Sequence, residues 1–573
     1  MKYHFFFLAC TILGTSGTMA QPLHGSREFT RADTLRGSSG PDRAWWDVTH
    51  YDVTVKPDFV NKSIQGTTAI TFRAIGSAQR MQIDLQQPLT VDHVVRGYAD
   101  STKLEFERDS NIVWVTVPAG AAGVVETIYI SYHGTPREAK NAPWDGGWIW
   151  KTDAQGNPWM SVACQGLGAS VWYPCKDHQS DEPDSAALHI TVPDTLQAVG
   201  NGRLRNTVKN NDGTTTWNWA VVNPINSYNL VPYIGKYAHF GEVYNGAEGR
   251  LDCDYWVLKE NETKAREQFK QVPLMLNCFE DWFGPYPFYQ DSYKLVEAPH
   301  LGMEHQSAVA YGNHFQNGYL GRDLSGSGWG LKWDYILVHE SGHEWFGNNI
   351  TTNDIADMWV HEGFTDYSET IYTQCQFGDA AGDDYVVGLR KNIRNDKPII
   401  GPYSVNQEGS GDMYSKGANM LHTIRHIINN DSLFKAMLRE MNRRFYHKTV
   451  TSAEVENFMV NFNVRSGFLD KSVFDQYLRT TQIPVLEWGV RKGVLWKRWT
   501  NCVPGLILPV ILTEDGKLPE MQFVTSNWGS SPCTKKNHSR LEVDRNWYVE
   551  TKPLSKKELR KRKPGIGLGT PLF

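Results

Sequence analysis

The stretch at residues 339–343, HESGH, decides the fold expected for the middle of this 573-residue chain. Residues four apart lie on the same face of an α-helix, so His339 and His343 can both bind one metal ion. Glu340, between them, can then reach a water molecule on that ion. Apolar residues just before the motif give such a helix a side on which to pack. The motif therefore predicts a helix with a Zn²⁺ site.

A third protein ligand is needed, because a catalytic zinc site has three protein ligands and keeps one position open for water. Glu362 supplies it, in the stretch WVHEGF at residues 359–364, nineteen residues after His343. The intervening loop can bring a second helix back beside the first. A competing metzincin pattern would need a glycine and a third histidine soon after the motif, but Phe346 and Asn349 occupy those places.

These residues and three further motifs resemble the gluzincin aminopeptidase family, which includes aminopeptidase N, aminopeptidase B and leukotriene A4 hydrolase. HLGMEH at residues 300–305 resembles the family's Gly-Ala-Met-Glu-Asn motif, and YSKG at 414–417 resembles its Tyr-x-Lys-Gly motif. Cys164-Gln165, with WYPC at 172–175, resembles the segment that brings a glutamine into the site from the N-terminal domain. The resemblance covers about residues 45–515, most of the chain.

The resemblance implies a hydrolase with one Zn²⁺ per chain, held by His339, His343 and Glu362. A bound zinc ion lowers the pKa of its water and polarises the scissile carbonyl group. Glu340 is then the general base that later carries the proton to the leaving amine. Tyr414 is expected to donate its phenolic hydrogen to the tetrahedral oxyanion.

The same resemblance makes the enzyme an exopeptidase that acts on peptides with a free N-terminus. Glu304 is expected to pair with the α-ammonium group of the substrate, and a blocked amine would leave this carboxylate unpaired. Gln165 would add a hydrogen bond to the same amine or to the first side-chain pocket. Gly302 and Met303 would line the floor beneath the peptide.

Four positions depart from the family's usual residues. Leu301 stands where the first glycine of its motif is usual, and His305 where asparagine is usual. His361 replaces the asparagine common before the zinc-binding glutamate, and Glu344 replaces a common glutamine. None of these changes removes a ligand or the base. The two beside Glu304 leave the side-chain preference at the N-terminal position open.

The length of the chain suggests about three or four domains. Its composition, 40% hydrophobic and 12% aromatic, is sufficient for a buried core and too apolar for a disordered protein. From about residue 45 to 240 apolar residues alternate with period two, as at Tyr51, Val53 and Val55, which indicates antiparallel strands. From about 260 to 480 the spacing is helical, and strand-like runs return after Pro484. We expect a multidomain α+β protein with four parts: a signal peptide (1–20), an N-terminal antiparallel β domain (21–240), a thermolysin-like, mainly α-helical zinc catalytic domain (241–480), and a small C-terminal β-sandwich with a basic tail that we expect to be solvated or disordered (481–573).

The N-terminal segment is typical of a secretory signal peptide, with Lys2, an apolar run and a small-residue cleavage site before Gln21. The run is too short to span a bilayer, so we expect a secreted or periplasmic protein without stable membrane insertion. A net charge of −5 argues against nucleic acid as a partner. Loss of Cys10 with the signal peptide leaves an odd number of cysteines, which argues against a disulfide framework. The oligomeric state stays open.

Three other functions compete with the aminopeptidase. A secreted zinc endopeptidase could use the same motif, but it has no use for an ammonium anchor such as Glu304. An epoxide hydrolase like leukotriene A4 hydrolase would need a lipid-shaped pocket, which no sequence pattern reveals. A binding protein with an inactive site is disfavoured because the ligands and Glu340 are intact.

Overall fold

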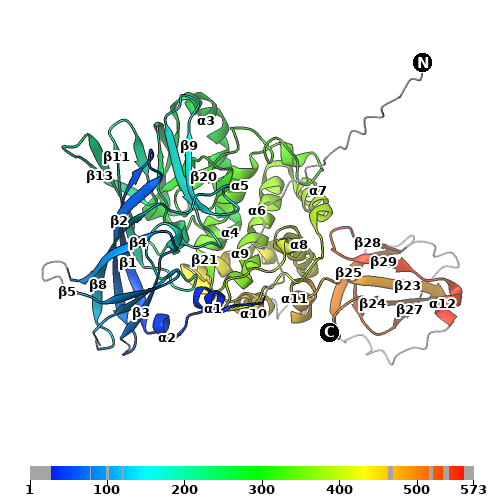
Figure 1. Cartoon of the computed structure of the whole chain (residues 1–573). Coiled ribbons are helices and arrows are strands. Elements are labelled where there is room, and N and C mark those ends of the chain that lie inside the picture. Colours follow the sequence, from blue (N-terminus) through cyan, green and yellow to red (C-terminus); the bar gives the residue numbers. More distant parts are fainter. Residues whose placement is uncertain are drawn as a thin grey trace, which may run out of the picture.

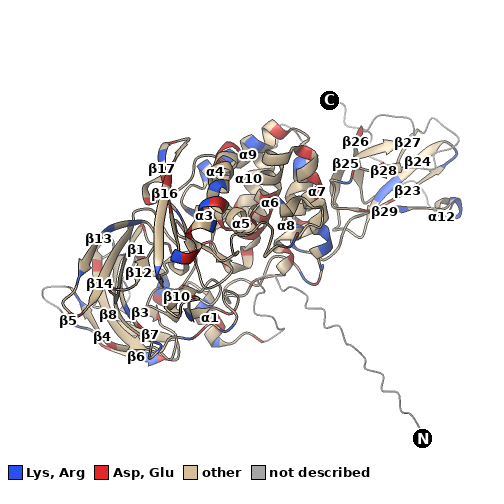
Figure 2. Cartoon of the chain, turned by 90° about the horizontal axis from the view of Figure 1, so that it is seen from above, with Lys and Arg blue, Asp and Glu red and all other residues tan. Residues whose placement is uncertain are grey.

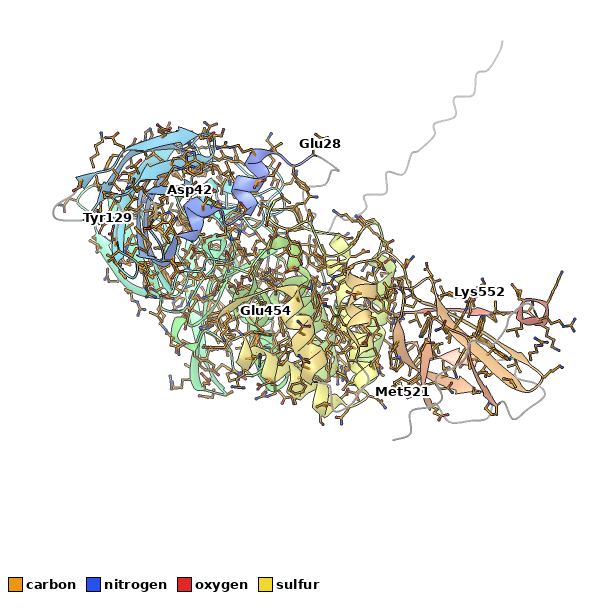
Figure 3. The ribbon with its side chains drawn as sticks, turned by 90° about the horizontal axis from the view of Figure 1, so that it is seen from below. Glu28, Asp42, Tyr129, Glu454, Met521 and Lys552 are labelled. Atoms are coloured by element: carbon orange, nitrogen blue, oxygen red, sulfur yellow. A yellow bond between two sulfur atoms is a disulfide. The ribbon has the colours of Figure 1, made fainter. Side chains whose placement is uncertain are left out.

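The computed structural model describes residues 28–77, 79–97, 102–118, 121–462, 469–514, 520–532 and 541–560. These residues form three bodies in a row, which Figure 1 shows from one side and Figure 2 from above. We name them the N-terminal body (28–235), the helical body (237–478) and the C-terminal body (485–560). Figure 3 places Asp42 and Tyr129 on the first, Glu454 on the second, and Met521 and Lys552 on the third. The predicted signal peptide and most of the basic tail lie outside the described residues.

The N-terminal body consists mainly of β-sheet. The alternation at Tyr51, Val53 and Val55 puts these side chains in the core, where each is at most 1% exposed. The largest sheet has the strand order β13-β14-β11-β1-β2-β8-β4-β5. Its pairs are antiparallel except β1 with β11, which the residue pattern did not indicate. The elements of this body are α1 (Arg31–Gly37), α2 (Pro41–Ala44), β1 (Trp46–Asp58), β2 (Ser63–Ala74), β3 (Arg80–Asp84), β4 (Thr90–Arg96), β5 (Thr102–Lys103), β6 (Phe106–Asp109), β7 (Ile112–Thr116), β8 (Val125–Gly134), β9 (Gly147–Thr152), β10 (Pro158–Ala163), β11 (Ser185–Pro193), β12 (Gln197–Val199), β13 (Arg203–Lys209), β14 (Thr214–Val221) and β15 (Tyr233–Gly235).

The helical body packs its helices against a sheet of order β16-β17-β18-β20-β19. Two of its helices, α5 and α6, carry the HESGH motif and the third expected zinc ligand. The elements are β16 (Tyr237–Gly246), β17 (Gly249–Leu258), α3 (Glu262–Gln268), α4 (Val272–Phe283), β18 (Tyr293–Glu297), β19 (Gly302–Met303), β20 (Val309–Tyr311), α5 (Tyr335–Gly342), β21 (Ile350–Thr352), α6 (Trp359–Phe377), α7 (Asp379–Leu389), α8 (Ser415–Ile428), α9 (Asp431–Arg444), β22 (Lys448–Val450), α10 (Ser452–Phe462) and α11 (Lys471–Leu478). No helix among the described residues has both the length and the apolar character needed to cross a bilayer.

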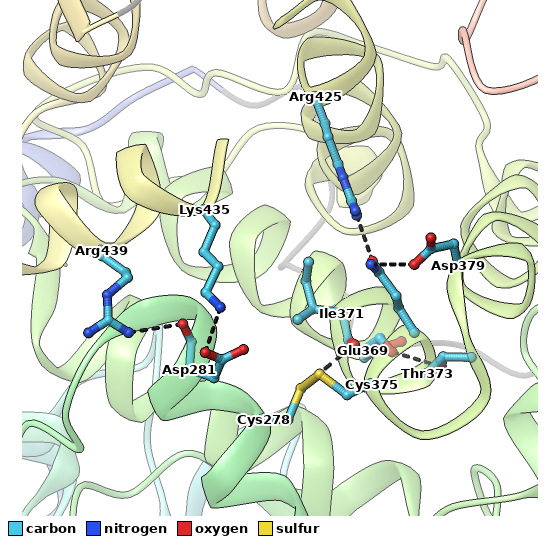
Figure 4. Close-up of a disulfide and its surroundings, with 11 residues drawn as sticks. Cys278, Asp281, Glu369, Ile371, Thr373, Cys375, Asp379, Arg425, Lys435 and Arg439 are labelled. Carbon is cyan, nitrogen blue, oxygen red and sulfur yellow. Dashed lines mark hydrogen bonds and ion pairs between the residues drawn. A yellow bond between two sulfur atoms is a disulfide. The ribbon is translucent and has the colours of Figure 1, made fainter. Parts of the chain in front are cut away.

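A disulfide between Cys278 and Cys375 joins α4 to α6 (Figure 4). Beside it, Lys435 of α9 forms an ion pair with Asp281 of α4 at 2.5 Å. The bond therefore ties the helix that carries the third expected zinc ligand to its neighbour. The other described cysteines are free.

The C-terminal body is formed by two sheets, with strand orders β27-β24-β23-β29 and β26-β25-β28. Its apolar core continues into that of the helical body, so the two bodies share buried residues across their boundary. The first residues of the basic run form a short helix, in which Leu559 is 3% exposed and the other four residues are exposed to solvent. The elements are β23 (Val485–Arg491), β24 (Val494–Thr500), β25 (Ile507–Glu514), β26 (Glu520–Thr525), β27 (Gly529–Pro532), β28 (Leu541–Val543), β29 (Glu550–Pro553) and α12 (Lys556–Arg560).

Candidate active site

The three expected zinc ligands converge on one point. Helix α5 ends at Gly342, and His343 keeps helical backbone angles as its C-cap, so the two histidines stay on one face. Nε2 of His343 lies 3.3 Å from Oε2 of Glu362, and Nε2 of His339 lies 3.7 Å from the same oxygen. Ligand atoms bound tetrahedrally to zinc at about 2.0–2.1 Å lie about 3.3 Å apart, so these spacings fit the ion. The Glu362 oxygen is buried and receives no hydrogen bond from a described residue, which also fits a cation site.

The outer nitrogens of the two histidines are held by protein atoms. Nδ1 of His339 lies 2.6 Å from Oε1 of Glu369, whose other oxygen accepts a hydrogen bond from Tyr385 at 2.5 Å. Nδ1 of His343 lies 3.0 Å from the carbonyl oxygen of Phe346. These contacts leave both Nε2 atoms aimed at the metal position, and such outer contacts set the ring orientation and ligand basicity.

Two local features of the chain place α5 against α6. The side chain of Asp334 caps α5 by accepting a hydrogen bond from the Leu337 amide at 3.2 Å. Gly342 allows the close approach, because a Cβ there would lie 2.5 Å from Oγ of Ser368 on α6. A larger residue would have to displace the side chains of Ser368 and Thr365 on the helix that carries Glu362.

Glu340 points into the same space and is 8% exposed. Burial raises the pKa of its carboxyl group to about 7. Gly302 leaves room for it, since a Cβ at that position would lie 2.7 Å from Oε1 of Glu340. A carboxylate with a raised proton affinity near neutral pH suits a general base.

Glu304 receives hydrogen bonds from two residues of the N-terminal body. Nε2 of Gln165 lies 2.5 Å from its Oε1, and the Tyr228 hydroxyl donates to the same oxygen at 2.9 Å. Its own carbonyl accepts from Asn348 at 2.8 Å. Burial raises the pKa of Glu304 from its ordinary value. The N-terminal body therefore helps to hold the carboxylate expected to bind the substrate amine.

Tyr414 is the residue immediately before α8, and its ring stacks at 6.2 Å from that of His339. Burial, followed by the charge of Glu362, raises its pKa well above the ordinary value, so the phenol keeps its hydrogen. Gly417, the last residue of the YSKG stretch, faces Gly363, which directly follows Glu362. A Cβ on Gly417 would lie 2.9 Å from Cα of Gly363. The pair lets α8 cross α6 closely enough to bring the tyrosine to the site.

The structure brings all nine expected site residues to one cavity. It also places residues there that the sequence patterns had not indicated, among them Pro143, Trp144, Tyr319 and Tyr335. The expected residues lining the cavity are Gln165, Gly302, Met303, Glu304, His339, Glu340, His343, Glu362 and Tyr414.

Sequence reasoning also missed Glu369 and Tyr228. Glu369 lies seven residues after Glu362, two turns along the same helix face, and that spacing could have indicated it. Tyr228 has no such signal, because it comes from a loop of another body. Of the departures from the family pattern, His361 accepts a hydrogen bond at Nε2 from the Thr352 amide at 2.9 Å, so its part is to hold the loop before α6.

Two helices packed beside a sheet, carrying two histidines and a glutamate as metal ligands and a second glutamate as base, define a zinc metallopeptidase. Comparison with family models gives the particular family: the Peptidase family M1 domain matches residues 268–477, and the Peptidase M1 N-terminal domain matches residues 48–229. The chain belongs to the peptidase M1 family. The predicted family, enzyme class and zinc cofactor are thereby confirmed.

Curated relatives and solved structures agree with this assignment. The chain is 22% identical to leukotriene A-4 hydrolase of Xenopus laevis, over 77% of this chain and 73% of that protein. It is 21% identical to endoplasmic reticulum aminopeptidase 1 of Mus musculus, over 76% of this chain but only 49% of that protein, so it spans about half of that relative. The M1 zinc metallopeptidase of Deinococcus radiodurans superposes with a TM-score of 0.65 at 21% identity, over 78% of this chain and 96% of that one. This likeness confirms the predicted fold class.

Proposed function

We propose that the protein is a secreted or periplasmic zinc aminopeptidase that hydrolyses the first peptide bond of peptides with a free amino terminus. One observation carries the proposal: the buried carboxylate of Glu304 lines the same cavity as the metal ligands. A cation must offset such a buried charge, and the α-ammonium group of a peptide supplies one. A relative of known structure, the Deinococcus radiodurans enzyme, has been seen with the peptide Tyr-Ser-Ala.

The residues around the cavity account for each chemical task. His339, His343 and Glu362 would hold zinc, which when bound supplies a Lewis acid that activates water and polarises a carbonyl. Glu340 removes the proton from the attacking water and delivers it to the leaving amine. Tyr414 donates its hydrogen to the oxyanion as negative charge develops there.

Glu304 and Gln165 set the distance between the substrate amine and the reacting carbonyl. An internal peptide segment has no ammonium group to place against Glu304, and its entry would leave a buried carboxylate unpaired. The site therefore favours an exopeptidase over the zinc endopeptidase that shares the motif. The preferred N-terminal side chain stays open.

The first experiment compares aminoacyl fluorogenic substrates, each free and N-acetylated, with and without a chelator. We expect hydrolysis of the free forms alone, lost with the chelator and restored by zinc. Hydrolysis of acetylated forms at a similar rate would contradict the role of Glu304.

Two variants separate binding from chemistry in the same assay. Glu304→Gln keeps the shape but removes the charge, and should lower kcat/KM for free substrates by roughly 30- to 150-fold, about 2–3 kcal/mol. Tyr414→Phe should lower kcat by about 100- to 1000-fold with little change in KM, because it removes a contact made in the transition state. If both variants raised KM equally and left kcat unchanged, the assignment of Glu304 to binding and Tyr414 to the transition state would be contradicted.

Two features support an extracytoplasmic location: the signal-like N-terminal segment and the disulfide between Cys278 and Cys375. Structural disulfides persist in oxidising compartments. N-terminal sequencing of the mature protein should begin at Gln21. An uncut chain found only with cytoplasmic markers would refute the location.

A further inference from the structure

A second group of metal-type ligands lies outside the lining of the cavity described above. It combines Asp383 of α7 with His422 and His426 of α8, and one ligand atom from each lies within 4.8 Å of the other two. Asn546, in the segment between β28 and β29 of the C-terminal body, reaches the same place. Its Oδ1 lies 3.2 Å from Nε2 of His422. The group therefore sits where the helical and C-terminal bodies meet, on the side of α7 and α8 that Figure 1 shows facing the C-terminal strands.

Two spacings measured from His422 are similar to those of the active site. Nε2 of His422 lies 3.7 Å from Oδ1 of Asp383 and 3.2 Å from Oδ1 of Asn546. In the active site the corresponding distances to the Glu362 oxygen are 3.7 and 3.3 Å. Both sets are close to the separation of about 3.3 Å between neighbouring ligands of a tetrahedral zinc ion.

The remaining polar atoms of these side chains are arranged as in a ligand set. His422 is fully buried, and its Nδ1 lies 3.2 Å from the Tyr367 hydroxyl, which leaves Nε2 to face the group. Nε2 of His426 is buried and has no hydrogen-bond partner among the residues that the structure describes. Oδ2 of Asp383 lies 3.3 Å from Nδ2 of Asn546, so Oδ1 stays free to bind. A buried imidazole nitrogen without a partner carries a desolvation penalty that a metal ion would remove.

We propose that a second divalent transition-metal ion, with zinc the best fit, binds between Asp383, His422, His426 and the side-chain oxygen of Asn546. Two imidazoles and a carboxylate favour zinc over magnesium or calcium, which prefer oxygen ligands alone. Four protein ligands close the coordination sphere, so the ion is structural rather than catalytic.

The ion would fasten the C-terminal body to the helices of the helical body. The same segment is already held there by Arg390, which donates to the carbonyl oxygens of Arg545 and Asn546 at 2.8 and 3.2 Å. Arg545 in turn forms an ion pair with Asp384 at 2.6 Å. Asp384 therefore lies at the same junction, but its partner is Arg545 and it is not one of the proposed metal ligands. Substitution of Asp384 is a matched control for substitution of Asp383.

The test measures metal per chain in the full-length protein, loaded with zinc and then dialysed. We expect two zinc ions in the wild type, one in Asp383→Asn and two in the control Asp384→Asn. Asp383→Asn should also unfold at a lower temperature than Asp384→Asn, while its activity per catalytic zinc stays unchanged.

A variant of the active site makes the test independent of how Asp383→Asn folds. Glu362→Gln removes a ligand of the first site and should still retain one zinc per chain. One zinc in the wild type and none in Glu362→Gln would overturn the proposal. Two zinc ions in Glu362→Gln would instead show that the active-site ligands are wrongly assigned, and would leave the second site standing.

Discussion

The crossing of α6 and α8 allows a sharp test of how the site is assembled. Gly363 directly follows Glu362, and Gly417 lies three residues after Tyr414. In Gly417→Ala the new methyl carbon would lie 2.9 Å from Cα of Gly363. Non-bonded carbons prefer about 3.5–4.0 Å, so the helices must separate by roughly 0.6–1 Å. The clash is with backbone, so no side-chain rotation can relieve it.

The size of the effect follows from this shift. Overpacking of a tight contact destabilises a protein by about 1–3 kcal/mol. A misplacement of about 1 Å in a catalytic group can lower turnover about 100-fold. We therefore expect Gly417→Ala to lower both the thermal unfolding temperature and kcat, because Tyr414 moves away from Glu362. The metal should stay bound, since its ligands lie on α5 and α6 rather than on α8.

The assay compares kcat, KM, bound zinc and thermal unfolding for Gly417→Ala with those for Gly411→Ala. Gly411 precedes Tyr414 by three residues, and a Cβ there would meet no heavy atom of a described residue within 4 Å. The control should retain wild-type values. Wild-type kcat and stability in Gly417→Ala would refute the close-crossing argument, and a loss of zinc would show that the shift reaches α6.

Three further predictions concern the general base Glu340, the residue that holds the outer nitrogen of His339, and a partly buried histidine. Glu340→Gln should keep zinc but lose most turnover, and metal analysis beside the peptide assay checks this; an active variant would refute the mechanism. Glu369→Gln removes the carboxylate at Nδ1 of His339 and should weaken zinc binding by about 10- to 100-fold in a competition with a chelator. Burial lowers the pKa of His178 from 6.5 to about 4, and its ring contacts the Gly37 carbonyl oxygen at 3.3 Å. As the pH falls, His178 is therefore protonated in the unfolded chain before it is protonated in the folded protein. The free energy of unfolding should decrease as the pH falls from about 6.5 to about 4. In thermal unfolding, His178→Gln should lose less stability than the wild type over that pH range.

The zinc site could be predicted because its information is local. The two histidines need only helical periodicity, and Glu362 needs only a loop that returns a second helix to the first. The sequence does not show why residues 363 and 417 are glycine. The structure shows that α6 and α8 cross there, with too little space for a Cβ on Gly417. A sequence pattern shows that a residue is small, but not which backbone approaches it.

Contacts between bodies escaped prediction for the same reason. Tyr228 and Glu304 lie 76 residues apart, and no periodicity links a loop to a strand end in another body. Asn546 is likewise one asparagine among many until the C-terminal body is packed beside α8. The parallel pairing of β1 with β11 also depends on the path of the chain, whereas alternation alone indicates only that both are strands.

These contacts bear on what the N-terminal body does. Gln165 and Tyr228 donate hydrogen bonds to the carboxylate of Glu304. Asn229 donates to the side-chain oxygen of Asn348 at 2.8 Å. The side-chain amide of Asn348 in turn donates to the backbone carbonyl of Glu304. The helical body alone contains every group needed to bind zinc and activate water. The two donors to the Glu304 carboxylate come from the N-terminal body. If Glu304 binds the substrate amine as proposed, hydrolysis therefore depends on one body, and selection of the chain end depends on the junction of two. We therefore expect substitutions at this junction to alter selection for free amines before they alter the rate of bond cleavage.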